Sequence, residues 1–349
     1  MPHDYVISAR KIEKGNFVAE PGPVRYLRVP SNASAALPAY ATAGAGDLGL
    51  WIDEVIGLAD GDENPNSISL RGDILVFVHG YNNSPETILW RQRRLNEDLK
   101  AEGWRGVVIG FDWPCEEKPL NYLEDRKDAA AVALQLVRSC VKHIMKAQNH
   151  GCETNIHLIG HSTGAYVIME AFAQAEKDGE LFKSPWRIGQ VAFIGADVAA
   201  HALSSGDDWA APMFRRIMRL TNYTNPYDSA LGISNAKRLG TAPRVGRAGA
   251  PLDPDPKVAD VDCGPYFSSL NPANAIFAKD ANFTHSWHVG DRVFARDLAM
   301  TLEGAIDRRA ISTRRIEGGR LTLCNEPRPP YMHAWNIRGV TGGSSPPSS

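Results

Sequence analysis

The stretch that decides the fold is Asn-Ile-His-Leu-Ile-Gly-His-Ser-Thr-Gly at residues 155–164. Its first half is apolar and predicts a short strand, and apolar residues recur at helical spacing over 165–172. Between strand and helix stands Gly160-His-Ser-Thr-Gly164, a G-x-S-x-G pattern in the strand–turn–helix context that the pattern requires. We therefore predict that Ser162 lies at the tip of a tight turn above the edge of a sheet.

A serine in that position is a candidate nucleophile. Its hydroxyl projects from the turn, and the backbone N–H of Thr163 opens a helix, where it suits a developing oxyanion. A serine in a glycine-rich turn can also be purely structural. The assignment therefore depends on a base and an acid elsewhere in the chain.

Strands and helices alternate on both sides of this turn. A continuous apolar run predicts a strand at 74–79, and further strand-like segments are expected at 107–111, 191–195, 217–223 and 257–262. Amphipathic patterns predict helices from Pro85, capped by Ser84, to Gly103, and at about 123–143 and 289–304. This alternation predicts βαβ crossovers and an α/β fold with a mostly parallel central sheet flanked by helices.

The chain divides into three parts by composition. Residues 1–70 form an N-terminal β extension with two short strand-like runs, at 5–8 and 24–29, packed on the core, and residues 30–72 look irregular. Residues 71–307 form the catalytic domain. Residues 308–349 form a basic, then proline- and glycine-rich tail whose last ten or so residues are predicted to be disordered.

Composition narrows the class of protein. The 349 residues are 43% hydrophobic and 22% charged, enough for a sizeable core, and the net charge of −2 favours neither nucleic acid nor an acidic membrane surface as a partner. Neither a signal peptide nor a membrane-spanning run is expected. The five cysteines are widely spread without a C-x-x-C pair, which predicts reduced thiols in a cytoplasmic protein.

The chain supplies an acid and then a histidine after Ser162, at predicted strand ends. Asp228 follows the strand at 217–223, and His285 lies between the last strand and the last helix. The order Ser, Asp, His is that of α/β hydrolases. Asp197, at the previous strand end, is the alternative acid, and His288 is the alternative base.

The second oxyanion donor is expected after the first strong strand. His79-Gly-Tyr-Asn82 follows it, Gly80 permits close backbone approach, and the N–H of Tyr81, or less favourably of Asn82, can point inward. We predict that His79 braces the turn through hydrogen bonds rather than acting as a base.

These pieces together resemble a bacterial α/β-hydrolase family of unknown function with esterase- and lipase-like motifs. The matching segments, over roughly residues 70–305, are Val76–Asn82, Phe111–Pro114, Tyr122 with Asp125, Gly160–Gly164, Ala196–Asp197, Tyr227–Leu231, Arg244–Gly246 and His285–Trp287. Position by position, the resemblance implies Ser162 as nucleophile, Asp228 as acid, His285 as base, and backbone donors near Tyr81 and at Thr163. The chain departs from the family where Gly-Ala-Asp197 replaces Ala-Pro-Asp and in the long segment 263–284.

The expected function is therefore that of a serine hydrolase that cleaves small-molecule carboxylic esters through an acyl-enzyme on Ser162. Neither a metal nor an organic cofactor is implied. An acyltransferase or an amidase would use the same three residues, and a non-catalytic binding protein could share the scaffold. The sequence does not indicate the oligomeric state.

Overall fold

The computed structural model describes residues 3–60, 73–81, 83–115, 122–141, 154–237, 242–271, 283–304 and 306–329. Its strands are β1 (His3–Glu13), β2 (Asn16–Pro30), β3 (Asp73–Val78), β4 (Val107–Asp112), β5 (Asn155–His161), β6 (Ile188–Ile194), β7 (Ile217–Thr224), β8 (Val258–Asp262), β9 (Arg314–Glu317) and β10 (Arg320–Leu323). They form one sheet in the order β2-β1-β4-β3-β5-β6-β7-β8-β10-β9. Only the outer pairs β1–β2 and β9–β10 are antiparallel. The expected mostly parallel sheet is confirmed.

Helices fill the connections between the strands. The α-helices are α1 (Ala45–Asp60), α2 (Pro85–Ala101), α3 (Tyr122–Gln135), α5 (Thr163–Lys177), α6 (Gly179–Lys183), α7 (Ala211–Arg216), α8 (Ser229–Lys237), α9 (Val245–Ala248), α10 (Gly264–Ser269), α11 (Phe283–Ser286) and α12 (Arg292–Glu303). Short 3₁₀ turns span Pro38–Tyr40 and Ala200–Leu203, and a π-helical turn spans Leu136–Val141. None of the described helices has the length and apolar character needed to cross a membrane.

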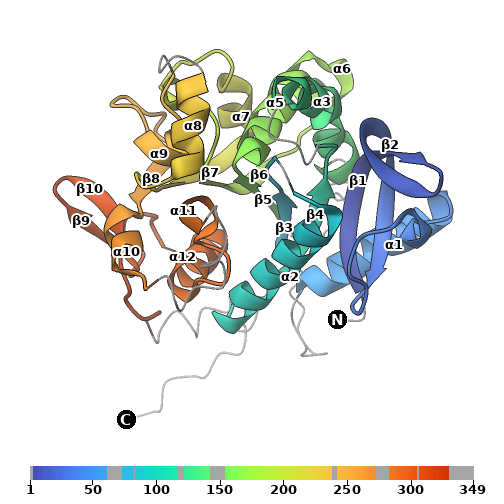
Figure 1. The fold of residues 1–349 in the computed structure, drawn as a ribbon, viewed down its shortest axis with the longest axis horizontal. Helices are drawn as coiled ribbons and strands as arrows, with labels where there is room; N and C mark the ends of the chain where they lie inside the picture. The colour runs from blue at the N-terminus through green and yellow to red at the C-terminus, as the bar shows by residue number, and fades with distance from the viewer. Residues whose placement is uncertain are drawn as a thin grey trace, which may run out of the picture.

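The sheet is buried on both faces, as its continuous apolar strands predict. Along β3, Ile74, Val76 and Val78 pack into one core, while Leu75 and Phe77 pack into another. Residues of α3 and α5 belong to the first core and residues of α2 and α12 to the second. Figure 1 shows these two pairs of helices on opposite sides of the sheet. The alternation follows from the two-residue period of a strand.

Two helix starts agree with local chemistry. Ser84 caps α2 by accepting a hydrogen bond from the Thr87 N–H at 3.2 Å, with Pro85 as the first helical residue, as predicted. The last helix begins at Arg292 rather than at 289, because the Asp291 side chain accepts from the Phe294 N–H at 2.8 Å and acts as the N-cap.

The N-terminal strands are longer than the predicted runs, and they belong to the central sheet. β1 pairs in parallel with β4, so that Ser8 lies opposite Asp112. The segment 30–72, expected to be irregular, contains α1, whose Trp51 is buried and donates through Nε1 to the Leu27 carbonyl at 3.0 Å. The glycines and alanines around the apolar residues of α1 obscured its helical period.

The segment from residue 308, treated above as a tail, contains β9 and β10. β10 pairs in parallel with β8 and extends the sheet. The three cysteines whose side chains are described, Cys115, Cys263 and Cys324, are buried free thiols. The last ten residues and Cys152 lie outside the described residues.

A fully buried ion pair attaches the C-terminal hairpin to α12. Arg314 Nε lies 2.9 Å from Asp297 Oδ2, and both side chains are inaccessible to solvent. Thr313 Oγ1 donates to the same carboxylate oxygen at 2.6 Å, and Arg314 Nη2 donates to Tyr223 Oη at 3.3 Å. The guanidinium and the carboxylate therefore compensate each other within a low-dielectric site.

Replacing Arg314 by Met is expected to lower the free energy of unfolding by about 3–5 kcal/mol, because the Asp297 carboxylate would remain buried without its counter-charge. Urea denaturation followed by fluorescence measures this. The matched control is Arg315→Met, because Arg315 pairs with Glu317 in an exposed ion pair and should cost less than about 1 kcal/mol. Equal losses for the two variants would contradict a special role for the buried pair.

Candidate active site

The predicted site residues gather at one edge of the sheet. Parallel strands end on the same side, and sites of open α/β sheets form there. Tyr81, Ser162, Asp197, Asp228 and His285 follow β3, β5, β6, β7 and β8, respectively.

Ser162 lies in a sharp turn between β5 and α5. Its backbone has φ 56° and ψ −123°, a strained conformation for a residue with a side chain. Its N–H donates to the Ile194 carbonyl at 3.0 Å, and its carbonyl accepts from the Asp197 N–H at 3.1 Å, so β6 holds the turn from the side. A methyl group on Gly164 would lie 2.1 Å from the Val78 carbonyl oxygen, so only glycine allows α5 to start this close to β3.

His285 and Asp228 form a direct hydrogen bond. The His285 Nδ1 and Asp228 Oδ2 atoms are 2.6 Å apart, and both residues are buried. The other carboxylate oxygen of Asp228 accepts from the Leu231 N–H at 2.9 Å, at the start of α8. Since a carboxylate can only accept, the proton lies on Nδ1 of His285, and its Nε2 can act as a base when the ring is neutral.

The His285 ring lies beside the serine turn. A methyl group on Gly195, the residue after Ile194, would lie 3.1 Å from both Nδ1 and Cε1 of His285. The ring centroid of His161 is 4.6 Å from that of His285, and His161 Nε2 lies 3.1 Å from the His285 carbonyl oxygen. The structure thus brings the three predicted residues to one place. No hydrogen bond joins the Ser162 hydroxyl to His285 among the described residues, and such contacts often tighten only when substrate binds.

The alternative acid has other partners. Asp197 is buried, and its Oδ1 accepts from Ser234 Oγ at 3.0 Å and lies 3.5 Å from Arg244 Nε. Its backbone N–H donates to the Ser162 carbonyl in the serine turn. The geometry therefore favours Asp228 over Asp197 as the partner of the histidine.

The alternative base, His288, is buried beside His161. The His288 ring centroid lies 4.9 Å from that of His161, and its Nδ1 makes no hydrogen bond within the described part of the chain. Burial, followed by the positive charge of Arg91, lowers the pKa of His288 well below its usual value. A neutral, enclosed ring without a carboxylate partner is a poor match to the role of base, so the geometry favours His285.

His161 is likewise a neutral buried ring. Burial, with smaller effects from His285 and His288, lowers its pKa well below the usual value. Because His161 Nε2 faces the His285 carbonyl, it donates there and holds the backbone of the candidate base. His161 thus lies beneath the serine turn as a support for the candidate base.

The candidate oxyanion donors lie on two neighbouring elements. Thr163 is the first residue of α5, where backbone N–H groups have no partner inside the helix. A methyl group on Gly80 would lie 2.7 Å from Ser162 Cβ, which brings the turn containing Tyr81 against the serine. Asn82 lies outside the described residues.

The sequence singled out neither Arg10 nor the Asp112 side chain, which form a buried ion pair at 2.7 Å behind His79. Arg10 directly follows the mostly apolar run Tyr5–Ala9, and an arginine at the end of a buried run is a signal that could have drawn attention to it. Among the described residues, no group of three or more His, Cys, Asp or Glu side chains has the arrangement to hold a metal ion.

Comparison with known proteins gives a family match and a set of distant structural similarities. The model of a family described as "Alpha/beta hydrolase of unknown function (DUF900)" matches residues 66–251, more than half of the chain. No curated protein matches.

Three solved structures illustrate the structural similarities. Phospholipase PlaB from Legionella pneumophila is 12% identical, with 72% of this chain and 67% of that chain covered and a TM-score of 0.34. A metagenomic carboxyl esterase is 11% identical, with 70% and 80% covered and a TM-score of 0.35. Carboxyl esterase 2 from the fungus Tuber melanosporum is 12% identical, with 88% and 92% covered and a TM-score of 0.37. At these values none of them bears on the chemistry of this chain.

Proposed function

The chain belongs to the family of α/β hydrolases of unknown function, and on that premise we propose that it is a serine hydrolase that cleaves carboxylic esters through an acyl-enzyme on Ser162. The observation that carries the proposal is the 2.6 Å hydrogen bond from His285 Nδ1 to Asp228 Oδ2, with the His285 ring beside the strained serine turn. The nucleophile Ser162, the orienting acid Asp228 and the base His285 then follow three strands, in the chain order Ser, Asp, His.

In the proposed first half-reaction, the Ser162 hydroxyl oxygen attacks the ester carbonyl carbon while His285 Nε2 takes the hydroxyl proton. The carbonyl oxygen becomes an oxyanion that accepts hydrogen bonds from the N–H groups of Thr163 and Tyr81. When the intermediate collapses, the ester C–O bond breaks, and the histidine gives its proton to the leaving alcohol. The acyl group is then bound to Ser162.

In the second half-reaction, water attacks the acyl carbon, and His285 accepts a proton from it. Collapse releases the carboxylic acid and returns the proton to the serine oxygen. Asp228 keeps the proton of His285 on Nδ1 throughout and stabilises the imidazolium that forms in each half. Its burial strengthens that interaction, because little water lies between the two charges.

The direct test is covalent labelling. We expect the purified protein to react with a fluorophosphonate probe at one site, and peptide mass spectrometry should find the adduct on the peptide containing Ser162. A panel of p-nitrophenyl esters of increasing acyl length, run on the same preparation, would give the preferred chain length. A protein that neither reacts with the probe nor hydrolyses any ester of the panel would overturn the proposed function.

A further inference from the structure

A buried chain of polar groups leads from β1 to the turn after β3. Arg10 Nε donates to Asp112 Oδ1 at 2.7 Å, and Ser8 Oγ donates to Asp112 Oδ2 at 2.9 Å. The same Asp112 Oδ1 lies 3.4 Å from His79 Nε2. All four side chains are buried, and His79 is inaccessible to solvent. The cluster joins three strands, β1, β4 and β3, at the edge where the candidate site lies.

The Asp112 carboxylate at the centre of this polar cluster is held in its charged form. Burial alone would raise the pKa of Asp112, but the Arg10 guanidinium and His79 together outweigh it and lower the pKa to about 2. A charged, buried carboxylate of this kind is a strong acceptor for its neighbours. Removing Arg10 would therefore change the protonation of the Asp112 carboxylate as well as its position.

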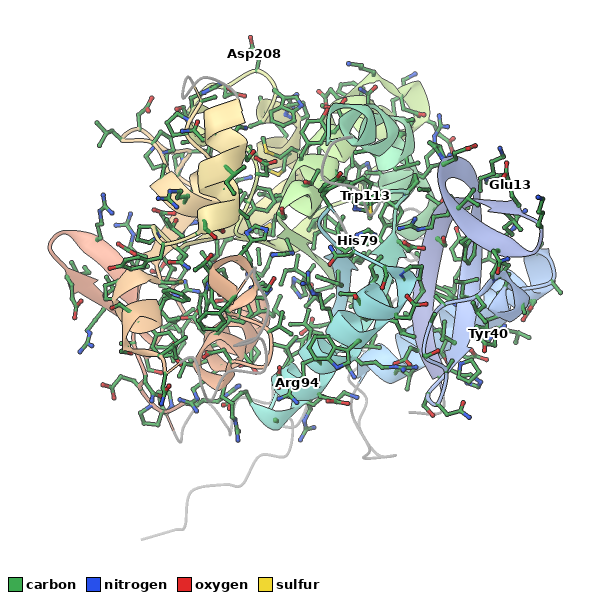
Figure 2. All side chains as sticks on the ribbon, in the orientation of Figure 1. Glu13, Tyr40, His79, Arg94, Trp113 and Asp208 are labelled. Carbon is green, nitrogen blue, oxygen red and sulfur yellow. The ribbon has the colours of Figure 1, made fainter. Side chains whose placement is uncertain are left out.

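His79 connects Asp112 to the Gly80–Tyr81 peptide through a hydrogen bond to the Gly80 carbonyl. Its Nδ1 lies 2.8 Å from the Gly80 carbonyl oxygen, and because a carbonyl only accepts, Nδ1 carries the proton. The ring stacks on Trp113, with centroids 5.3 Å apart and planes within 9°. Figure 2 labels these two side chains near the centre of the molecule. Trp113 Nε1 in turn donates to the His79 carbonyl at 2.7 Å.

The second ring nitrogen of His79, Nε2, can be unprotonated or protonated, and the hydrogen bond from Nδ1 to the Gly80 carbonyl is present in both forms. When Nε2 is unprotonated, it accepts from the Trp113 N–H at 3.2 Å. Burial lowers the pKa of His79, but hydrogen bonding and charge from Asp112 and Cys115 together outweigh it and raise the pKa to about 9. A second proton on Nε2 would then face Asp112 Oδ1. The hydrogen bond from Nδ1 to Gly80 is common to both forms.

The orientation of one peptide bond follows. The Gly80 carbonyl also accepts from Asn83 Nδ2 at 2.8 Å, so two donors hold it toward the buried side. A trans peptide is planar, and its N–H points opposite to its C=O. The N–H of Tyr81, which belongs to the same peptide, is therefore directed away from the buried cluster. Gly80 also lies against Ser162, since a methyl group in place of its Cα hydrogen would be 2.7 Å from Ser162 Cβ.

We propose that Arg10 and Asp112 act through His79 as positioning residues that aim the Tyr81 N–H at the oxyanion formed on Ser162. This inference rests on the proposed function. It makes β1, which lies outside the family match at 66–251, part of the catalytic apparatus. None of the three side chains needs to touch the substrate, because their effect is transmitted through the Gly80–Tyr81 peptide.

The main test is the variant Arg10→Met, with kinetics normalised to the number of serines that fluorophosphonate labels at completion. We expect kcat per labelled site for a p-nitrophenyl ester to fall about tenfold to a hundredfold, with KM changed less than about twofold, because one oxyanion donor contributes about 10²–10³-fold. The affinity for a trifluoromethyl ketone, which forms a tetrahedral oxyanion on serine, should fall by the same factor. Arg10→Lys should recover part of both losses.

The matched control is Arg93→Met. Arg93 Nε donates to Asp4 Oδ2 at 2.7 Å and so also ties β1 to the rest of the molecule. Its hydrogen bonds within the described residues go to Asp4 and to the Ala33 and Pro30 carbonyls, none of which belongs to the cluster around His79. We expect its kcat per labelled site to match the wild type. If Arg10→Met does not fold, Ser8→Ala removes a single hydrogen bond to Asp112 and should give a smaller loss in the same two measurements. Unchanged kcat per labelled site in the folded Arg10 or Ser8 variant would overturn the inference.

A spectroscopic measurement separates this inference from the proposed function. The His79 Nδ1 proton is buried and hydrogen-bonded, so it should give a slowly exchanging low-field proton resonance, identified by its loss in His79→Asn. We expect Arg10→Met to shift or broaden it and Arg93→Met to leave it in place. A shifted resonance with normal kcat would show that the cluster does not position a catalytic group. A wild-type protein that no fluorophosphonate labels would refute the function itself, and with it the role assigned to Tyr81.

Discussion

Ser162→Ala is expected to lower kcat for a p-nitrophenyl ester by about 10⁶-fold and to abolish fluorophosphonate labelling. Without the hydroxyl oxygen no acyl-enzyme can form, and water alone must attack the bound ester. The oxyanion donors and the binding surface would remain, so a small residual rate above that of the free solution is expected. The variant should fold normally, because alanine accepts the backbone conformation at 162 as well as serine does.

The control for this variant is Ser229→Ala. Ser229 directly follows the candidate acid, and its hydroxyl lies 2.7 Å from Oγ1 of Thr284, the residue before His285. It should keep wild-type labelling and turnover within a few-fold. Circular dichroism spectra of both variants would verify the fold. Retention of turnover by Ser162→Ala would exclude Ser162 as the nucleophile.

Asp228→Asn is expected to lower kcat by about 10⁴-fold while leaving the fold and the labelling site in place. The amide nitrogen of asparagine would donate to His285 Nδ1, which would move the ring proton to Nε2. A protonated Nε2 cannot accept the serine proton, so acylation would slow. Stopped-flow measurement of the acylation phase, with the steady-state rate for comparison, would locate the loss in that step.

The control is Asp197→Asn, at the neighbouring strand end. Its side chain lies against Ser234 and Arg244 rather than against a histidine, so kcat should stay within about tenfold of wild type. Asparagine can still accept from the Ser234 hydroxyl. The reverse result, a large loss at 197 and a small loss at 228, would exchange the roles of the two acids.

The strands in the middle of the sheet were predictable because each contains apolar residues in a short local run. The expected strand at 74–79 is observed as Asp73–Val78, and the one at 217–223, where apolar and polar residues mix, as Ile217–Thr224. Burial on both faces makes a strand such as Asp73–Val78 almost wholly apolar, and the local sequence is enough to recognise it. The β9–β10 hairpin is harder to predict, because its strands are short and β9 is mostly charged. It is held in place by the ion pair between Arg314 and Asp297 of α12, which a local sequence window does not contain.

The sheet edge at which the candidate residues gather was predictable, whereas the choice between neighbouring acids and histidines was not. Chain order and strand ends suggested Asp228 and His285, but Asp197 also stands at a strand end, and His288 is only three residues from His285. The true candidates are distinguished by which side chains face each other in the folded protein, and a linear sequence pattern does not contain that information. Arg10 was missed for the same reason, because its partner Asp112 is 102 residues away.

The strand order also has a consequence for biosynthesis. β4 and β5 join the two edges of β3, and β6, β7 and β8 each join the edge of the strand made just before, so this part of the sheet can assemble during synthesis. β1 cannot, since its register places Ser8 opposite Asp112, 104 residues later. Until β4 emerges, β1 has only β2 as a partner, and that antiparallel pairing covers one of its two edges during the interval in which an unpaired strand would invite aggregation.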